Sequence, residues 1–345
     1  MTLHSEIHEQ PARLANLLST QRKKIETIAQ AIRTRDPQFV FLAARGTSDN
    51  AGRYANYLWG AKNSLPIALA TPSLFTYYQQ PPKIQNALVV GISQSGQSPD
   101  IVSVLENGKK QGNLTLAITN EPNSPLAKNA DFILDIQAGD EKAVAATKTY
   151  TSQLMTIAML SAALSGEKAR WDELAQIAEW ADTALKQDRK IAQAAQRYRY
   201  MQQCVVLGRG YNYATAFEWA LKLKELTYVA AEPYSSADFK HGPVAIVESG
   251  FPVFAISPKG KVFDSMQNML KHLKNDLRAE LVLISNSLAA LELAEISIPI
   301  PENVPEWLTP LISIIPAQLF AYHLTLAKGY NPEEPRTIQK VTETR

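Results

Sequence analysis

Short apolar runs rich in β-branched residues recur along this chain, each bounded by polar residues or glycine. In the first half they lie at residues 39–44, 87–92, 114–118 and 132–136. Runs of this length without polar alternation are typical of parallel strands that are covered on both faces. Longer stretches of mixed polar and apolar character separate them. Strands and helices alternating in this way predict an α/β fold with a doubly wound parallel sheet.

The mixed stretches predict the helices. Residues 5–35 indicate two helices, the first interrupted at Pro11 and the second covering residues 22–34. A long helix is expected at residues 149–164. The segment 166–200, rich in Glu, Lys, Ala and Gln, indicates one or two connecting helices.

The second half of the chain repeats landmarks of the first. An Arg-Gly pair that ends at Gly46 recurs with its glycine at Gly210, 164 residues later. An Ile-Ser pair followed by Gly96 recurs before Gly260, again 164 residues later. Coincidence is the alternative, but a shared offset favours duplication of an α/β unit. The sequence therefore predicts N-terminal helices, a first subdomain, connecting helices, a second subdomain and a C-terminal tail, at residues 1–35, 36–165, 166–200, 201–330 and 331–345.

The stretch from residue 87 to 112 organises the first subdomain. Its strand is followed by the turn Ser-Gln-Ser-Gly-Gln-Ser (93–98) and then by a helix. Ser98 is a suitable N-cap for this helix, Pro99 is suitable as its first residue, and Gly112 is suitable as the residue that ends it. Three hydroxyls, carboxamides and free backbone N–H groups at a helix N-terminus suit a phosphate. An ordinary polar loop is the alternative, but this density of hydroxyls favours an anion site. The second copy lacks them, so one phosphate site per chain is expected.

Composition and motifs exclude several classes of function. The chain has 345 residues and a net charge of +2, without a long Lys/Arg run, which argues against nucleic-acid binding. It has neither a P-loop nor a dinucleotide fingerprint, so we expect a phosphorylated small molecule as ligand and no nucleotide cofactor. We find no membrane-spanning run and no signal peptide. The single cysteine, Cys204, lies in an apolar run, and a cytoplasmic location is the natural inference.

Candidate acid–base residues lie on a helix predicted at about residues 213–229. Glu218, Lys222 and Glu225 are spaced i, i+4 and i+7, so they share one face of this helix. A solvated salt-bridge stripe is the usual explanation for such a pattern. Here apolar residues flank the stripe, and desolvation would shift the pKa values towards acid–base chemistry. The spacing alone leaves both readings open.

One histidine differs in context from the other four. His241 lies in a Gly/Pro-bounded loop, where functional residues concentrate, and imidazole titrates near neutrality. His4 and His8 are expected in a mobile N-terminus, and His272 and His323 within helical patterns. No pair has an evident metal-ligand spacing, so no metal site is expected.

The C-terminal segment after Gly329 contains two prolines and then Ile338 and Val341. A frayed tail is the default expectation for a chain end. The prolines and apolar residues instead favour an extended segment that docks on the protein. Lys340 would then reach a site.

Seven stretches, in order along the chain, resemble motifs of the sugar isomerase (SIS) family. Each is weak alone, but together they cover essentially the whole chain. They are Arg45-Gly46-Thr47-Ser48, the Ser93–Ser98 turn, Val144–Lys148, Leu207–Gly210, Ala220–Glu225, Lys240–Pro243, and Pro335-Arg336 with Lys340. Within the family they resemble the isomerase half of glucosamine-6-phosphate synthases.

This resemblance implies two SIS subdomains and a homodimer in which the histidine loop completes the neighbouring subunit's site. It implies a 6-phosphate site formed by Ser93, Gln94, Ser95 and Ser98. It also implies a sugar site lined by Ser48 and Val144.

The resemblance further implies roles in catalysis. Glu225 would transfer protons between C1 and C2 of the sugar with the help of Lys222. His241 would open the sugar ring, and Lys340 would lie at the open-chain carbonyl, where the synthases form a Schiff base. Glu218 lies on the same helix face, and its role is less defined.

The chain also departs from the synthases. Ala146 replaces a serine, and Gln97 and Ser98 replace Glu and Thr, as in stand-alone glucosamine-6-phosphate deaminases of the SIS type. The synthases carry an N-terminal glutaminase domain with a cysteine nucleophile. This chain starts just before the isomerase part and its cysteine is internal, so we do not expect it to release ammonia from glutamine.

The leading prediction is therefore an aminosugar-phosphate deaminase/isomerase that converts glucosamine 6-phosphate to fructose 6-phosphate and ammonia. A fructosamine-6-phosphate deglycase or a galactosamine-6-phosphate deaminase would use the same scaffold. A non-catalytic phosphosugar sensor is the alternative from another class. Such a sensor would tolerate the loss of Glu225, His241 and Lys340, and their joint presence favours an enzyme.

Overall fold

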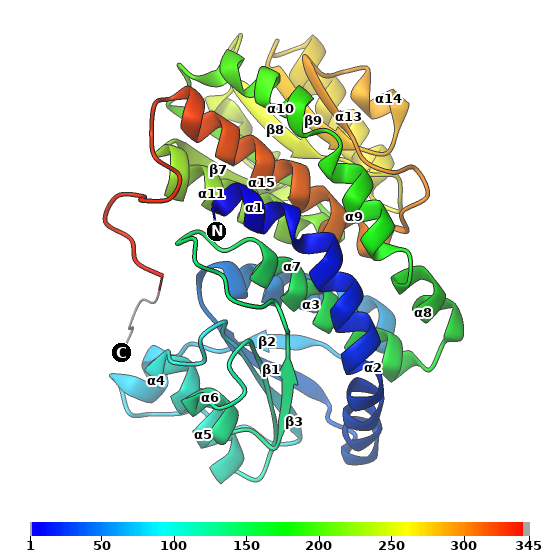
Figure 1. Cartoon of the computed structure of the whole chain (residues 1–345), viewed down its shortest axis with the longest axis vertical. Helices are drawn as coiled ribbons and strands as arrows, with labels where there is room; N and C mark the ends of the chain where they lie inside the picture. Colours follow the sequence, from blue (N-terminus) through cyan, green and yellow to red (C-terminus); the bar gives the residue numbers. More distant parts are fainter. Residues whose placement is uncertain (1, 341–345) are drawn as a thin grey trace. The chain divides into compact units, whose positions relative to one another are not determined.

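The computed structural model describes residues 2–340, which form two compact units, each with its own sheet (Figure 1). We name the units after their strands. The β1–β5 unit contains Ala12–Glu141, Lys148–Ala175 and the tail from Gln339. The β6–β10 unit contains the residues up to Pro11, together with Lys142–Thr147 and Gln176–Ile338. The segment predicted to connect the subdomains is thus divided between the two units.

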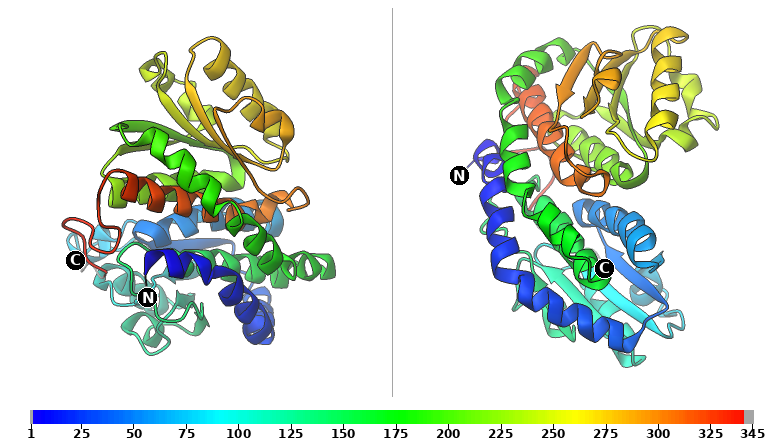
Figure 2. Two further views of the ribbon diagram at one scale, coloured as in Figure 1. Left: turned by 45° about the horizontal axis from the view of Figure 1, so that its top comes forward. Right: turned by 90° about the vertical axis from the view of Figure 1, so that its right-hand side faces the viewer.

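The β1–β5 unit is built on a five-stranded parallel sheet with the order β2-β1-β3-β4-β5. Its strands are β1 (Phe39–Ala44), β2 (Ile67–Leu69), β3 (Ala87–Ile92), β4 (Leu114–Thr119) and β5 (Phe132–Asp135). Helices flank this sheet (Figure 2). They are α2 (Gln10–Arg35), α3 (Gly46–Asn63), α4 (Ser73–Thr76), α5 (Pro99–Lys110), α6 (Pro125–Lys128), α7 (Lys148–Ser165) and α8 (Lys168–Leu174).

The β6–β10 unit repeats this topology with the order β7-β6-β8-β9-β10. Its strands are β6 (Gln203–Gly208), β7 (Ala230–Ser235), β8 (Pro252–Ile256), β9 (Glu280–Ser285) and β10 (Ile296–Pro299). Its helices are α1 (Leu3–His8), α9 (Ile177–Leu185), α10 (Asp188–Ala195), α11 (Tyr213–Thr227), α12 (Ser236–Phe239), α13 (Phe263–Asn275), α14 (Leu288–Leu291) and α15 (Thr309–Ala327). Two parallel sheets with the same strand order confirm the predicted duplication of an α/β unit.

The two cores are equivalent as well. In the β1–β5 unit the apolar face of α5, with Val104 and Leu105, is buried against Val89 of the sheet. In the β6–β10 unit α13, which also follows the third strand of its sheet, buries Met269 against Val253. Each fully buried side chain of this kind contributes roughly 1.5–3 kcal/mol. The helix after the third strand is therefore a main packing element of each unit.

The apolar pattern did not predict two of the edge strands, β2 and β7. β2 has three residues that are not buried, and β7 contains Pro233 and two exposed residues, so neither forms an apolar run. A proline without an N–H is tolerated at a sheet edge, which is where β7 lies. The strands of the first sheet that were predicted from apolar runs agree with the structure to within one residue.

Three predictions about helical segments are wrong. Pro11 does not interrupt a helix but lies in the first turn of α2, which begins at Gln10 rather than at residue 22. A proline is accepted there because the first N–H groups of a helix have no intrahelical partner. His4 and His8 lie in α1, whose N-terminus carries a capping box, and not in a mobile tail. The segment 166–200 forms more and shorter helices than predicted, namely α8, α9, α10 and the 3₁₀ turn Gln196–Tyr198.

One stretch, Glu306–Ala327, is long and apolar enough to cross a membrane by length and composition. It includes α15, and 78% of its most apolar window is buried inside the protein. Within the β6–β10 unit α15 packs against α9, α10 and α11. This burial is what the central helix of a folded core shows.

The short N-terminal helix α1 is anchored by a buried carboxylate. Glu6 accepts hydrogen bonds from the backbone N–H groups of Lys142 (2.6 Å) and Ala143 (3.3 Å). The backbone N–H of Leu3 donates to the carboxylate of Glu333 at 3.0 Å. Helix α1 therefore joins two stretches that are distant in sequence, the 142–147 segment and the C-terminal tail.

We expect Glu6→Gln to lower the free energy of unfolding by about 2–3 kcal/mol. The amide presents an NH₂ group to one of the backbone N–H groups that the carboxylate accepted, so a buried donor is left without a partner. Denaturant unfolding measures the change. Glu179→Gln on the exposed face of α9 is the matched control and should change stability by less than about 0.5 kcal/mol. Equal effects of the two changes would contradict the anchoring role.

Candidate functional site

The Ser93–Ser98 turn connects β3 to α5, and two of its hydroxyls organise its own backbone. The N–H of Gly96 donates to Ser93 Oγ at 3.1 Å, and that of Gln97 donates to Ser95 Oγ at 3.3 Å. These N–H groups are therefore not free for an anion, contrary to the sequence-based expectation. Each hydroxyl accepts within the turn through a lone pair and retains its own O–H as a donor.

A glycine in this turn is required by both conformation and space. Gly96 has φ +61°, and a Cβ atom there would lie 2.1 Å from Ser124 Oγ. Its carbonyl also accepts a hydrogen bond from the N–H of Leu126 at 3.1 Å. The turn is thereby held against the loop that follows β4.

The start of α5 agrees with the prediction in position but not in its capping contact. Ser98 is the N-cap and Pro99 the first helical residue, yet the Ser98 side chain makes no capping hydrogen bond. The buried carboxylate of Asp100 accepts from Arg45 Nε at 2.8 Å and from the N–H of Ile101 at 2.9 Å. Because Arg45 offsets the negative charge of Asp100, this helix N-terminus can still attract an anion.

Ser48 follows β1, the strand that pairs with β3. It is in the first turn of α3, directly after β1, and β1 pairs with β3 up to Ala44 and Ile92. In a sheet of this strand order, the crevice between these strand ends is the usual place for a ligand. Ser48 is buried, and its Oγ accepts a hydrogen bond from Gln153 Nε2 of α7 at 2.9 Å. Its hydroxyl hydrogen thus also remains available as a donor.

A cavity of about 460 Å³ continues along the same edge of this sheet. It is lined by Gln94 and by acidic residues at the end of β5 and in the loops after β4 and β5, which are Asp135, Glu121, Asp140 and Glu141. The apolar pattern predicted the strand that contains Asp135 but not this acidic lining, because Glu121, Asp140 and Glu141 belong to no periodic element or recognisable motif.

Lys340 reaches this cavity. Its Nζ lies 2.5 Å from Oε2 of Glu141, a carboxylate that is itself buried and accepts from the N–H (3.1 Å) and the hydroxyl (2.8 Å) of Thr149. The tail is therefore docked as far as residue 340, as predicted, and is not frayed there. Val341, the second apolar residue named for this docking, lies outside the described residues.

In the β6–β10 unit the predicted acid–base residues form a buried group on α11. The Lys222 ammonium lies 2.5 Å from Glu225 Oε2 and 3.4 Å from Glu218 Oε1. The side chains of Lys222 and Glu218 are 1% and 0% exposed, whereas that of Glu225 is 23% exposed. The burial of Lys222 and Glu218 excludes a solvated salt-bridge stripe, whereas the acid–base role of the group stays a prediction. Glu225 is the member of this group that a ligand can reach.

Two other predicted residues lie in the β6–β10 unit. Val144 is half-buried in the 142–147 segment. Glu6 binds this segment at Lys142, and Gln318 Nε2 donates to the carbonyl of Thr147 at 3.3 Å at its other end. His241 is exposed in the turn after α12, where its N–H donates to the carbonyl of Asp238 at 3.0 Å. Their predicted roles towards a substrate stay predictions.

The tail is fixed by aromatic contacts before it reaches Lys340. The guanidinium of Arg336 lies 4.4 Å from the ring centre of Tyr228 and 5.0 Å from that of Tyr330. The backbone N–H of Arg336 also donates to the Tyr228 hydroxyl at 2.9 Å. Such cation–π contacts are worth about 0.5–2 kcal/mol each.

Cys204 takes no part in these arrangements. It is buried in β6, and burial raises the pKa of its thiol well above the ordinary range. At neutral pH the thiolate is therefore not populated, which excludes a nucleophilic role. The predicted role as a small core residue is confirmed.

We expect Gly96→Ala to be more destabilising than Gly112→Ala. Both glycines have positive φ, +61° and +79°, but a Cβ at Gly112 meets nothing within 4 Å, whereas one at Gly96 meets Ser124. Gly112→Ala should cost about 1–2 kcal/mol through backbone strain alone. Gly96→Ala should cost about 1–3 kcal/mol more through overpacking. Thermal and denaturant unfolding compare the two, and equal costs would show that the turn can open without penalty.

Comparison with known proteins agrees with this architecture. The model of the family described as "SIS domain" matches residues 35–163 and 199–328. Glutamine--fructose-6-phosphate aminotransferase [isomerizing] from Thermococcus kodakarensis is 34% identical over 97% of this chain and 56% of its own length. The chain therefore spans little more than half of that relative.

Two solved structures are similar over nearly the whole chain. The C-terminal domain of glucosamine-fructose-6-phosphate aminotransferase from Francisella tularensis has a TM-score of 0.84 and 29% identity, covering 96% of this chain and 98% of that one. A candidate phosphosugar isomerase from Silicibacter pomeroyi DSS-3 has a TM-score of 0.86 and 30% identity, covering 96% and 100%. With both of its parallel-sheet units matched by the same family model, this chain belongs to the SIS domain family and carries two SIS domains.

Proposed function

We propose that this chain is a cytoplasmic aminosugar-phosphate deaminase/isomerase that converts glucosamine 6-phosphate to fructose 6-phosphate and ammonia. The observation that carries the proposal is the buried lysine of α11, held between Glu218 and Glu225. Burying Lys222 and Glu218 away from water is costly, and buried ionisable groups concentrate where protons are transferred. An aldose–ketose conversion requires a base that removes a proton from one carbon and returns it to the next.

The proposed reaction begins with opening of the sugar ring, assisted by His241. Glu225 then removes the proton from C2, and protonation at C1 converts the C1 aldehyde to an alcohol and leaves an imine at C2. Water adds to this imine and expels ammonia, which leaves the C2 ketone. Lys222 would hold the Glu225 carboxylate in place through their 2.5 Å contact, and Lys340 would interact with the carbonyl oxygen of the open chain.

The serine turn is the proposed phosphate site. The hydroxyls of Ser93 and Ser95 keep their hydrogens as donors, and that of Ser98 is not engaged in capping α5. The side chain of Gln94 borders the neighbouring cavity. Neutral donors at a helix N-terminus suit a phosphate monoester.

The acidic lining of this cavity supports the proposal that the substrate carries an amino group. Four carboxylates favour a cationic group over a neutral hydroxyl, although Lys340 offsets part of their charge. The replacements at Gln97, Ser98 and Ala146, which resemble those of deaminases, point the same way. We also propose that the chain acts as a homodimer in which the exposed His241 loop serves the neighbouring subunit.

Glu225→Gln should lower kcat for ammonia release from glucosamine 6-phosphate by about 10²–10⁴-fold, because a positioned general base contributes that much. Binding of the phosphosugar should persist, since the proposed phosphate site is unchanged. An ammonia-coupled assay and calorimetric binding measure the two effects. Glu232→Gln on the exposed edge strand β7 is the matched control and should leave kcat unchanged. Full activity of Glu225→Gln would remove this residue as the base.

The same assay on three substrates distinguishes the alternatives. Ammonia released from fructosamine 6-phosphate or galactosamine 6-phosphate, and not from glucosamine 6-phosphate, would replace the proposal by a deglycase or by a deaminase for the other epimer. Tight phosphosugar binding without turnover, equal in the wild type and in Glu225→Gln, would indicate a sensor.

Ser98→Ala should raise KM for the phosphosugar by about 10-fold and leave kcat nearly unchanged. One hydrogen bond to a charged group is worth about 1.5–3 kcal/mol, and the phosphate does not react. Ser103→Ala, later on the same helix α5, is the control, because its hydroxyl bonds the carbonyl of Asp100. Steady-state kinetics measure both variants, and an unchanged KM for Ser98→Ala would count against the phosphate site.

A further inference from the structure

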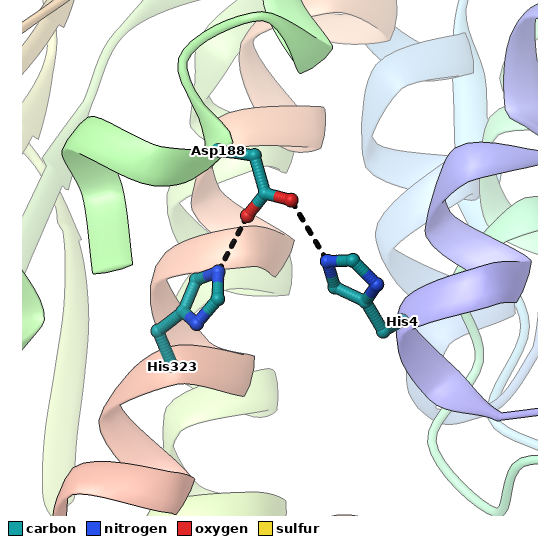
Figure 3. A group of neighbouring side chains, drawn as sticks. All are labelled: His4, Asp188 and His323. Atoms are coloured by element: carbon teal, nitrogen blue, oxygen red, sulfur yellow. Dashed lines mark hydrogen bonds and ion pairs between the residues drawn. The ribbon is translucent and has the colours of Figure 1, made fainter.

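Three imidazole rings surround one carboxylate in the β6–β10 unit. His4 Nε2 lies 2.8 Å from Asp188 Oδ2, and His323 Nε2 lies 2.5 Å from Asp188 Oδ1. Figure 3 shows both rings directed at the carboxylate, each at its own oxygen. His8, one turn after His4, places its Nε2 3.1 Å from Oδ2. The sequence pattern does not reveal this group, because its members come from three segments that are far apart in the chain.

The ligand atoms of this group are accessible to solvent, and the residues that carry them lie on helices. The side chains of His4, Asp188 and His323 are 34%, 23% and 15% exposed, so an ion from solvent can reach their ligand atoms. Each residue lies on a helix: His4 on α1, Asp188 at the first position of α10, and His323 on α15. Ligands on helices are held more precisely than ligands on loops.

The ligand atoms have the chemistry and the spacing of a divalent metal site. The nearest N and O atoms of His4, Asp188 and His323 all lie within 4.8 Å of one another. Tetrahedral zinc with bonds of about 2.0–2.2 Å separates its ligand atoms by about 3.4 Å, which small side-chain rotations reach from here. Imidazole and carboxylate ligands together suit Zn²⁺ and its neighbours in the first transition series.

A hydrogen-bonded clamp is the simpler explanation, and the composition of the group argues against it. The two oxygens of a carboxylate have enough lone pairs for three imidazole donors, so it is the charge of the group, and not the number of donors, that disfavours a clamp. Among the described residues Asp188 has no lysine or arginine partner, so with neutral rings the group carries a net negative charge. A divalent cation supplies the missing positive charge and binds imidazole nitrogens and a carboxylate through coordination bonds.

We propose that His4, Asp188 and His323 form a structural zinc site that fixes α1 to α10 and α15, with His8 as the candidate fourth ligand. Metal binding requires each Nε2 to give up its hydrogen, which moves to Nδ1 in a neutral ring. No substrate takes part, so the proposal is independent of the function proposed above.

The site would act through α1. The same short helix that carries His4 and His8 also holds the 142–147 segment through Glu6 and the tail through Leu3. A metal on α1 would therefore stiffen both the segment that contains Val144 and the tail that leads to Lys340. This is a positioning effect, because the metal ligands themselves are assigned no contact with substrate.

The test uses the full chain without an affinity tag, stripped of metal with a chelator. Co²⁺ titration followed by visible absorption reports tetrahedral coordination, and Zn²⁺ titration by calorimetry gives the stoichiometry and Kd. We expect one ion per chain and a raised Tm with Zn²⁺. Hydrogen exchange should show increased protection of the α1 amides. Absence of stoichiometric binding by the wild type would overturn the proposal.

Variants assign the ligands. His323→Asn and Asp188→Asn should each weaken Zn²⁺ binding by more than about 100-fold, since losing only a hydrogen-bond partner of a ligand costs about 10–100-fold. His272→Asn is the matched control, because His272 also pairs with an aspartate, Asp276, at 2.7 Å, but on α13. If His323→Asn fails to fold, the more exposed His4→Asn carries the test. An equal loss of affinity in His272→Asn would show adventitious surface binding.

Discussion

Parallel pairing is the constraint on which the arrangement of this protein depends. Every strand of a parallel sheet ends at the same edge, so residues that follow different strands are brought together there. In the β1–β5 unit this edge gathers the turns after β1 and β3, and then the loops after β4 and β5 that line the cavity. Ser48, Gln94 and Glu141 are distant in sequence, yet they belong to one edge of one sheet for this reason.

The two copies have the same sheet topology but differ in the functional groups that they contain. In the first unit Arg45, after β1, bonds Asp100 at the start of α5. In the second, Arg209, after β6, bonds Ser265 at the start of α13, so the link between strand end and helix start persists in both copies. The second copy lacks the hydroxyl-rich turn but has a buried charged group on α11. The copies thus retain the same structural link while their functional groups have diverged.

The sequence predicted the features that have a local physical cause. Apolar runs located the central strands, and the i, i+4, i+7 spacing placed Glu218, Lys222 and Glu225 on one face of α11. It did not predict the edge strand β7, which has no apolar run, or the acidic residue Glu141, which belongs to no periodic pattern. Pro11 was read as a helix breaker, although a proline in a first turn has no such effect. The histidines around Asp188 were missed because only tertiary packing brings α1, α10 and α15 together.

The hydrogen bond between Leu3 and Glu333 spans 330 residues of sequence, and it sets an order of events during synthesis. The sheet of the β1–β5 unit is complete once β5 has left the ribosome, whereas α1 gains its partners on α15 and the tail only after Glu333 has been synthesised. At about 5–20 residues per second, these partners follow α1 by roughly 15–60 s. Helix α1 can therefore bind the 142–147 segment through Glu6 well before it completes its contacts with α15 and the tail.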